Sequence, residues 1–164
     1  MRKMRRTFQE LTQAECVDIL EKSTAGTLAC IGDDSHPYAV PLSHVYADGK
    51  LYFHGALTGH RIDAVKHHPM VSYCVIGQDV IVPEELTTYY RSVIVFGRAR
   101  FVSDITEKRI ALWKLAQKYA PDLKALAIEE IDRYIDTVSV MVIDIDNMTG
   151  KEALKLKQGR SQAQ

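Results

Sequence analysis

The most informative run of this 164-residue chain reads Tyr52-Phe53-His54-Gly55-Ala56-Leu57-Thr58-Gly59-His60-Arg61. Its aromatic start predicts a short strand that ends at His54, and its small residues predict a turn into a helix that begins just after Thr58. The start of a helix offers free backbone N–H groups and the positive end of the helix dipole, and both favour an anion. Arg61, in the first turn, could clamp a phosphate with its planar fork. The run therefore predicts a phosphate site, and an exposed first turn is the alternative.

Strand and helix signals continue on both sides of this run. Thr12 and Glu15 fit a capping box at the start of a first helix. Asp48-Gly49 is a two-residue hairpin turn between an alternating strand over residues 38–46 and the strand that ends at His54. Pro41 cannot donate to a ladder, so it indicates an edge strand or a bulge.

The rest of the chain supplies the remaining elements. Further strands are expected at residues 27–31, 71–76, 91–102 and 138–145, and further helices from Asp104 and over residues 123–134. Residues 78–90 are expected to form a loop, and the tail from Lys155 is expected to be loose. No glycine-rich phosphate fingerprint follows a strand, which disfavours a dinucleotide-binding fold. Six strands joined mainly by hairpins predict a mainly β fold with flanking helices, in the form of a compact antiparallel barrel.

The length of the chain and its charge balance limit the domain count and the partners that are expected. We expect one domain over residues 1–150, followed by a polar C-terminal tail over residues 151–164. The 21 basic and 21 acidic residues balance, so no nucleic-acid partner is expected. We interpret a basic N-terminal cluster as a solvated tail, and the arginines of the 91–102 strand as a solvated face; these residues are Arg2, Lys3, Arg5 and Arg6, and Arg91, Arg98 and Arg100. No apolar run approaches the roughly 18 residues that span a bilayer, and no secretory signal is present, so we expect a cytoplasmic protein without a membrane partner.

Cysteine and histidine patterns argue against a metal centre. Cys16, Cys30 and Cys74 are far apart and form no Cys-x-x-Cys pair, so we interpret them as small buried residues in a reducing compartment. His67 and His68 are adjacent, and adjacent side chains on a helix point apart. No metal ligand set is expected.

Five segments, taken in order, resemble a known family: residues 24–29, 37–42, 52–61, 87–97 and 148–151. They are similar to the split β-barrel flavoproteins related to pyridoxamine 5'-phosphate oxidase, and more narrowly to the nitroimidazole-resistance (Nim-type) branch. The resemblance implies a six-stranded antiparallel split β-barrel of the FMN-binding type. It also implies a homodimer with FMN at the subunit interface.

The resemblance implies which residues contact FMN. A strand segment would lie along the isoalloxazine ring and the ribityl chain; its residues are Val40, Pro41, Leu42 and Ser43. His60 and Arg61 match a basic pair on the phosphate, with arginine where the family often has lysine. Ser92 matches a polar position that reaches the flavin from the partner subunit, and an ordinary strand residue is the alternative there.

His54 and Gly55 match the point where a strand end meets the cofactor. His54 is the candidate catalytic residue, as a proton donor or as an anchor for the flavin or a bound acid. A hydrogen-bonded histidine at the end of the barrel is the alternative. Tyr52 and His54 share one face of the strand, opposite Leu51 and Phe53.

The resemblance implies an FMN-dependent oxidoreductase. Electrons from NAD(P)H would reduce a small nitroaromatic acceptor of the 5-nitroimidazole type, or a related acceptor. One alternative is a non-catalytic flavin- or haem-binding carrier, with His44, His54 or His60 as an axial ligand. Another is a pyridoxamine 5'-phosphate oxidase-type enzyme, which is disfavoured because residues 154–160 lack the tryptophan of that family's substrate segment.

Overall fold

The computed structural model describes residues 3–162, so Arg2 of the basic N-terminal cluster and the last two residues of the predicted tail lie outside the described residues. The strands are β1 (Glu10–Leu11), β2 (Ala25–Ile31), β3 (Pro37–Ser43), β4 (Val45–Ala47), β5 (Lys50–Gly55), β6 (Met70–Val82), β7 (Thr87–Phe101) and β8 (Ser139–Glu152). The helices are α1 (Gln13–Lys22), α2 (His60–His67), α3 (Ile105–Tyr119), α4 (Lys124–Tyr134) and α5 (Leu154–Gln162).

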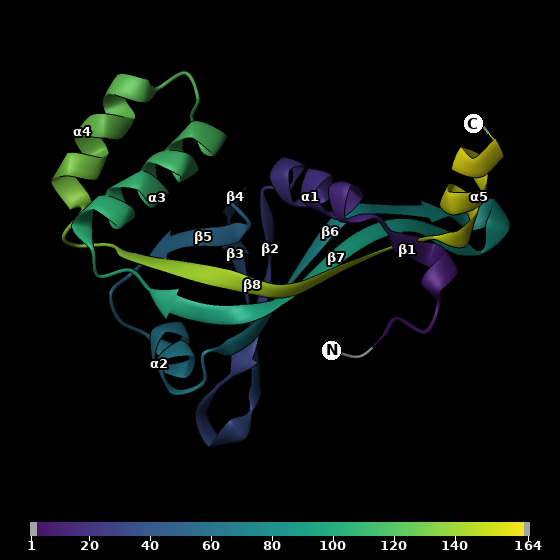
Figure 1. Cartoon of the computed structure of the whole chain (residues 1–164), viewed down its shortest axis with the longest axis horizontal. Helices are drawn as coiled ribbons and strands as arrows, with labels where there is room; N and C mark the ends of the chain where they lie inside the picture. Colours follow the sequence, from purple (N-terminus) through teal and green to yellow (C-terminus); the bar gives the residue numbers. More distant parts are fainter. Residues whose placement is uncertain (1–2, 163–164) are drawn as a thin grey trace.

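The strands form one antiparallel sheet in the order β3-β2-β6-β7-β8-β5-β4, and β1 pairs with β8. Helix α1 lies over the middle of the sheet, whereas α3 and α4 stand together at one end (Figure 1). Within the described residues no helix is long and apolar enough to cross a bilayer. The predicted fold class, mainly antiparallel β with flanking helices, is confirmed.

The strand count differs from the predicted six. The two residues of β1 are too short to give a sequence pattern. The predicted strand over residues 38–46 is divided at His44, because the Tyr119 hydroxyl accepts from the His44 N–H at 2.9 Å and donates to the His44 carbonyl at 2.7 Å. Both backbone groups of His44 thus leave the ladder, and β3 ends before β4 begins.

The prediction of a loop over residues 78–90 was wrong. β6 and β7 continue as a long hairpin whose turn holds Leu86 in the left-handed region at φ 49°. Gly77 marks a bulge between Ile76 and Gln78, after which pairing resumes. The tail is not loose throughout either, because α5 begins at Leu154 and Lys155 pairs with Glu85 at 2.7 Å.

Two apolar cores pack on opposite faces of β5. Leu51 and Phe53 belong to the barrel core beneath α1, and Tyr52 belongs to a second core that buries Ala111 and Leu115 of α3. The predicted division of this strand into two faces is therefore confirmed. It directs His54, two residues after Tyr52, toward the α3 side of the sheet.

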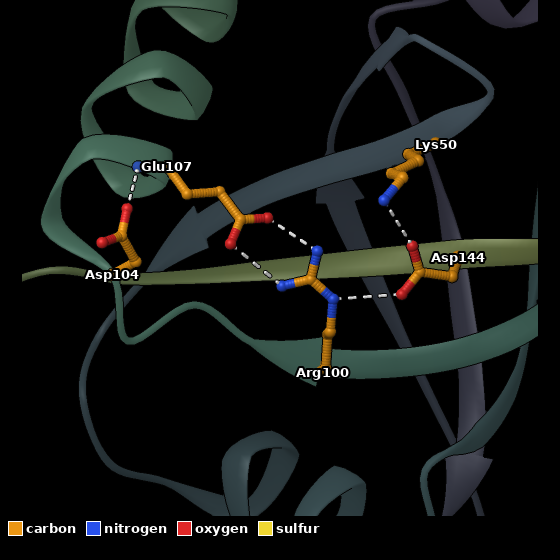
Figure 2. Close-up of polar contacts among 5 residues, drawn as sticks. All are labelled: Lys50, Arg100, Asp104, Glu107 and Asp144. Carbon is orange, nitrogen blue, oxygen red and sulfur yellow. Dashed lines mark hydrogen bonds and ion pairs between the residues drawn. The ribbon is translucent and has the colours of Figure 1, made fainter.

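The prediction that the arginines of β7 form a solvated face was wrong for two of the three. Arg91 Nε lies 3.3 Å from a carboxylate oxygen of the fully buried Glu152. Arg100 donates to Glu107 at 2.6 Å and to Asp144 at 3.1 Å, and Asp144 also pairs with Lys50 at 2.9 Å (Figure 2). This network fixes the first turn of α3 to β5, β7 and β8.

Arg100→Lys is expected to lower the free energy of unfolding by about 1 kcal/mol, because a lysine cannot bridge two carboxylates with a planar fork. The groups are partly exposed, so the loss should shrink at high salt. Arg98→Lys is the matched control, since Arg98 is exposed on the same strand and forms no ion pair in the described chain. Urea unfolding at low and high salt measures both variants, and equal stability of the two would contradict the bridging role.

Candidate functional site

The predicted strand–turn–helix is present, with a helix start one residue later than expected. β5 ends at Gly55, and α2 begins at His60 after Gly59, whose φ of 128° and ψ of 168° suit only glycine. Gly59 rather than Thr58 is the N-cap, and no side chain caps the helix. The N–H groups of Ile62 and Asp63 both donate to the Gly59 carbonyl. Those of His60 and Arg61 have no acceptor within the described residues, so they remain available to an anion.

Arg61 lies against Gly55 at this helix start. A Cβ atom added to Gly55 would meet the end of the Arg61 side chain, so the guanidinium lies directly against this glycine. The Arg61 side chain is half-buried, and it makes no hydrogen bond or ion pair within residues 3–162. Burial lowers the pKa of the guanidinium, which Tyr38 and Cys30 partly oppose. A half-buried cation without a counter-ion is costly, and an anionic ligand would remove that cost.

His60 points to a different part of the site. Its ring stacks on Tyr38 at 4.2 Å between centroids and would meet a Cβ added to Gly32. One ring nitrogen lies 3.9 Å from an Asp33 carboxylate oxygen. His60 and Arg61 therefore diverge from the start of α2, and only Arg61 lies over the end of β5.

His54 is the last outward-facing residue of β5. Its side chain is exposed at the surface, yet partial desolvation by the surrounding atoms is the main reason that the pKa of its imidazole is lowered, and the positive charge of Arg61 lowers it further. The ring is therefore neutral at pH 7, when one ring nitrogen can donate a hydrogen bond and the other can accept one. No described residue hydrogen-bonds to it, and its role in a site stays a prediction.

β3 brings the predicted cofactor strand to the edge of the sheet, as Pro41 indicated. The side chains of Val40 and Leu42 are partly buried and pack against the barrel core, away from the face that carries Pro41 and Ser43. Pro41 and Ser43 are exposed on the other face. Ser43 and His54 both line one cavity of about 380 Å³, which α3 and α4 complete.

Ser92 is separate from these residues in one chain. It pairs with Lys151 near the far end of β8, whereas His54 pairs with Val140 near its start. Ser92 lines another cavity, of about 440 Å³, between the N-terminal segment and the exposed face of β7 and β8. Lys151 also lines it, with its ammonium 5.5 Å from the ring centre of Tyr90.

A buried polar cluster beneath β3 was missed from the sequence. His44 is fully buried, with Nε2 donating to the Leu20 carbonyl at 2.9 Å and Nδ1 3.0 Å from the Tyr73 hydroxyl. The Tyr73 hydroxyl donates to the Leu42 carbonyl at 2.6 Å. Burial lowers the pKa of His44 to about 4. His44 is therefore enclosed, and its prediction as an axial haem ligand was wrong; its place on the inward face with Val40 and Leu42 was the available signal.

The three thiols are free and remain protonated at neutral pH. Burial raises the pKa of Cys16 to about 11, and it also raises the pKa of Cys30 and of Cys74. Across the described chain, no group of three His, Cys, Asp or Glu side chains is arranged to hold a metal ion. The site chemistry therefore rests on Arg61, His54 and the backbone around them.

Comparison with known proteins matches this geometry to a family. The family model described as pyridoxamine 5'-phosphate oxidase matches residues 12–152. No curated protein matches the chain.

Solved structures share the fold. A candidate 5-nitroimidazole antibiotic resistance protein from Bacteroides thetaiotaomicron is 22% identical, with 87% of this chain and 86% of that chain covered and a TM-score of 0.74. An FAD-binding protein from Mesorhizobium loti is 24% identical, with coverage of 88% and 96% and a TM-score of 0.66. An FAD- and haem-binding protein from Mycobacterium smegmatis is 20% identical, with coverage of 89% and 74% and a TM-score of 0.74.

Proposed function

This chain belongs to the pyridoxamine 5'-phosphate oxidase family, and from that membership we propose that it is an FMN-dependent oxidoreductase. The observation that carries the proposal is Arg61, a half-buried cation at an uncapped helix start with no counter-ion in the described chain. A flavin phosphate supplies the missing negative charge. The FAD-binding proteins among the structural neighbours support a flavin as the ligand.

The residues present fit this ligand. Arg61 and the free N–H groups of the first turn of α2 would hold the phosphate. Pro41, Ser43 and the edge backbone of β3 would line the ribityl chain and the ring. Ser92 would complete the site from a second copy, because it lies far from His54 in one chain. We therefore propose a homodimer with the flavin at the subunit interface, in the cytoplasm.

Bound flavin would supply reversible electron transfer between NAD(P)H and a second substrate. The candidate nitroimidazole-resistance neighbour favours a small nitroaromatic acceptor of the 5-nitroimidazole type. His54 would donate a hydrogen bond or a proton at the acceptor, since its neutral ring carries one N–H and has no partner in the described chain. Gly55 would let Arg61 lie close to the strand end without a clash.

His54→Gln is expected to lower turnover by roughly 100- to 10,000-fold, the usual contribution of a positioned proton donor. FMN affinity should change little, because Arg61 holds the phosphate. The measurement is oxidation of NADH and of NADPH by FMN-loaded protein with 2-methyl-5-nitroimidazole as the acceptor. His68→Gln, an exposed change just after α2, is the control. FMN-loaded wild-type protein that oxidises neither nucleotide would overturn the enzyme assignment.

A flavin- or haem-binding carrier is the second candidate. The Mycobacterium smegmatis neighbour binds FAD and haem, and His54 has ring nitrogens available for an axial bond. Haem binding would give a Soret band that the variant His54→Gln loses. Retention of that band in the variant would remove His54 as the ligand.

A further inference from the structure

The α3–α4 hairpin forms one wall of a solvent-open apolar cavity beside His54. α3 is anchored, since Ala111 and Leu115 are buried in the second core and the Arg100 network holds its first turn. α4 has no buried residue and packs against α3 at the end of the molecule (Figure 1). Between the helices and β5 lies the cavity of about 380 Å³, whose apolar wall consists of Leu112, Leu115, Ala116, Ala120, Leu123, Leu126, Ala127 and Ile131.

Among the described residues that line this cavity, His54 carries the side chain that is still available for hydrogen bonding. The Tyr119 hydroxyl is already used, because it accepts from the His44 N–H and its one proton lies between the carbonyls of Thr24 and His44. Ser43 hydrogen-bonds to the same hydroxyl. Among the lining residues, only His54 therefore offers a ring nitrogen without a partner in the described chain.

The charge of the lining disfavours acids. Glu130 is the one ionised lining side chain, and it pairs with Arg133, which lies outside the lining, at 3.0 Å. Within the described part of the chain no cation lines the cavity, so a carboxylate or phosphate deep inside it would lose hydration without gaining a partner. A neutral molecule loses little hydration free energy on entering the cavity, and it shields the apolar side chains of the wall from water.

We propose that this cavity binds an uncharged, mainly apolar small molecule whose one polar group accepts a hydrogen bond from His54. The volume suits a molecule of about two fused rings, at the lower end of small-molecule sites. The role of that molecule as a substrate rests on the proposed flavin chemistry, because His54 would contact both. Its binding does not require the flavin.

The test uses 2-acetylnaphthalene, which is neutral and carries one carbonyl, and 2-naphthoate, which has the same rings and a negative charge. Isothermal titration calorimetry of FMN-free and FMN-loaded protein should give saturable binding of the ketone and at least about tenfold weaker binding of the acid. Ala127→Phe should fill the cavity and weaken ketone binding by at least about tenfold. Ala125→Phe makes the same change on an exposed part of α4 outside the lining, and it should leave ketone binding within about twofold.

Two results would overturn the proposal: equal ketone binding by Ala127→Phe and wild type, or equal binding of ketone and acid by the wild type. Flavin uptake is measured separately on the same samples. Protein that binds the ketone but refuses FMN removes the proposed function and keeps the cavity assignment. Protein that binds FMN but not the ketone removes the cavity assignment and keeps the proposed function.

Discussion

Arg61→Ala is expected to weaken FMN binding by on the order of 1–3 kcal/mol, or about 5- to 150-fold. The guanidinium is half-buried against Gly55 at the start of α2, where the backbone N–H groups of His60 and Arg61 are also free. A phosphate there would accept charge-assisted hydrogen bonds in a partly dry place, and such bonds are stronger than neutral ones. Alanine removes the fork and keeps the helix start.

Riboflavin makes this prediction specific, because it has the same ring without a phosphate. Arg61→Ala should bind riboflavin as the wild type does, so that the loss appears only with FMN. The FMN affinity of Arg61→Lys should lie between those of the wild type and Arg61→Ala, since lysine keeps the charge without the planar fork. Lys66→Ala, an exposed cation on the same helix, is the control for overall charge. Equal loss of FMN and riboflavin affinity would mean that Arg61 supports the fold rather than the phosphate.

Acidification is expected to cost about 3 kcal/mol of folding free energy through His44. The folded-state pKa is about 4 against an ordinary value of 6.5, and each unit is worth about 1.4 kcal/mol. Since the folded pKa is depressed, the unfolded chain binds more protons between these values. The contribution is complete above about pH 6.5 and is lost as the pH falls toward 4.

The structural cause is the enclosure of His44. Nε2 donates to the Leu20 carbonyl and Nδ1 faces the Tyr73 hydroxyl, and the ring is fully buried. His44→Gln keeps a donor for the Leu20 carbonyl and cannot titrate. Urea unfolding of this variant at pH 7 and pH 4.5 should show a smaller stability loss than the wild type. His67→Gln, at an exposed position, should keep the wild-type slope, and an unchanged slope in His44→Gln would contradict this assignment.

Local signals predicted local structure well. The capping box of Thr12 and Glu15 and the side-chain cap of Asp104 both form, because each motif is satisfied within its own first turn. Asp48 and Gly49 adopt positive φ angles of 53° and 72° in the predicted hairpin turn. These interactions join residues that are close in sequence, so the sequence displays both partners together.

Bulges and interactions between residues far apart in the sequence could not be predicted from local signals. Gly77 and Asp146 resemble strand ends, yet pairing continues past each of them, so β6, β7 and β8 are longer than predicted. His44 leaves the ladder because of Tyr119, which lies 75 residues away. Arg100 finds Glu107 and Asp144 only after β7, α3 and β8 have packed.

Some features of the candidate site were predicted from local sequence, and others depend on packing. The helix start and its arginine were predicted from residues 52–61, because those features are contiguous. Three others depend on packing and could not be read from the sequence: the contact of Arg61 with Gly55, the missing counter-ion, and the cavity that α3 and α4 build beside His54. The roles of Val40, Pro41, Leu42, Ser43, His60 and Ser92 toward a flavin remain predictions.

A titration of the purified wild-type chain with FMN, and in parallel with FAD and riboflavin, decides whether Arg61 and the start of α2 hold a flavin phosphate. Flavin absorbance and fluorescence are followed until saturation, and gel filtration shows whether the flavin elutes with the protein. We expect saturable uptake of FMN, tighter than that of riboflavin because of the phosphate at Arg61. Protein that takes up no flavin, or that binds riboflavin as tightly as FMN, would contradict this expectation.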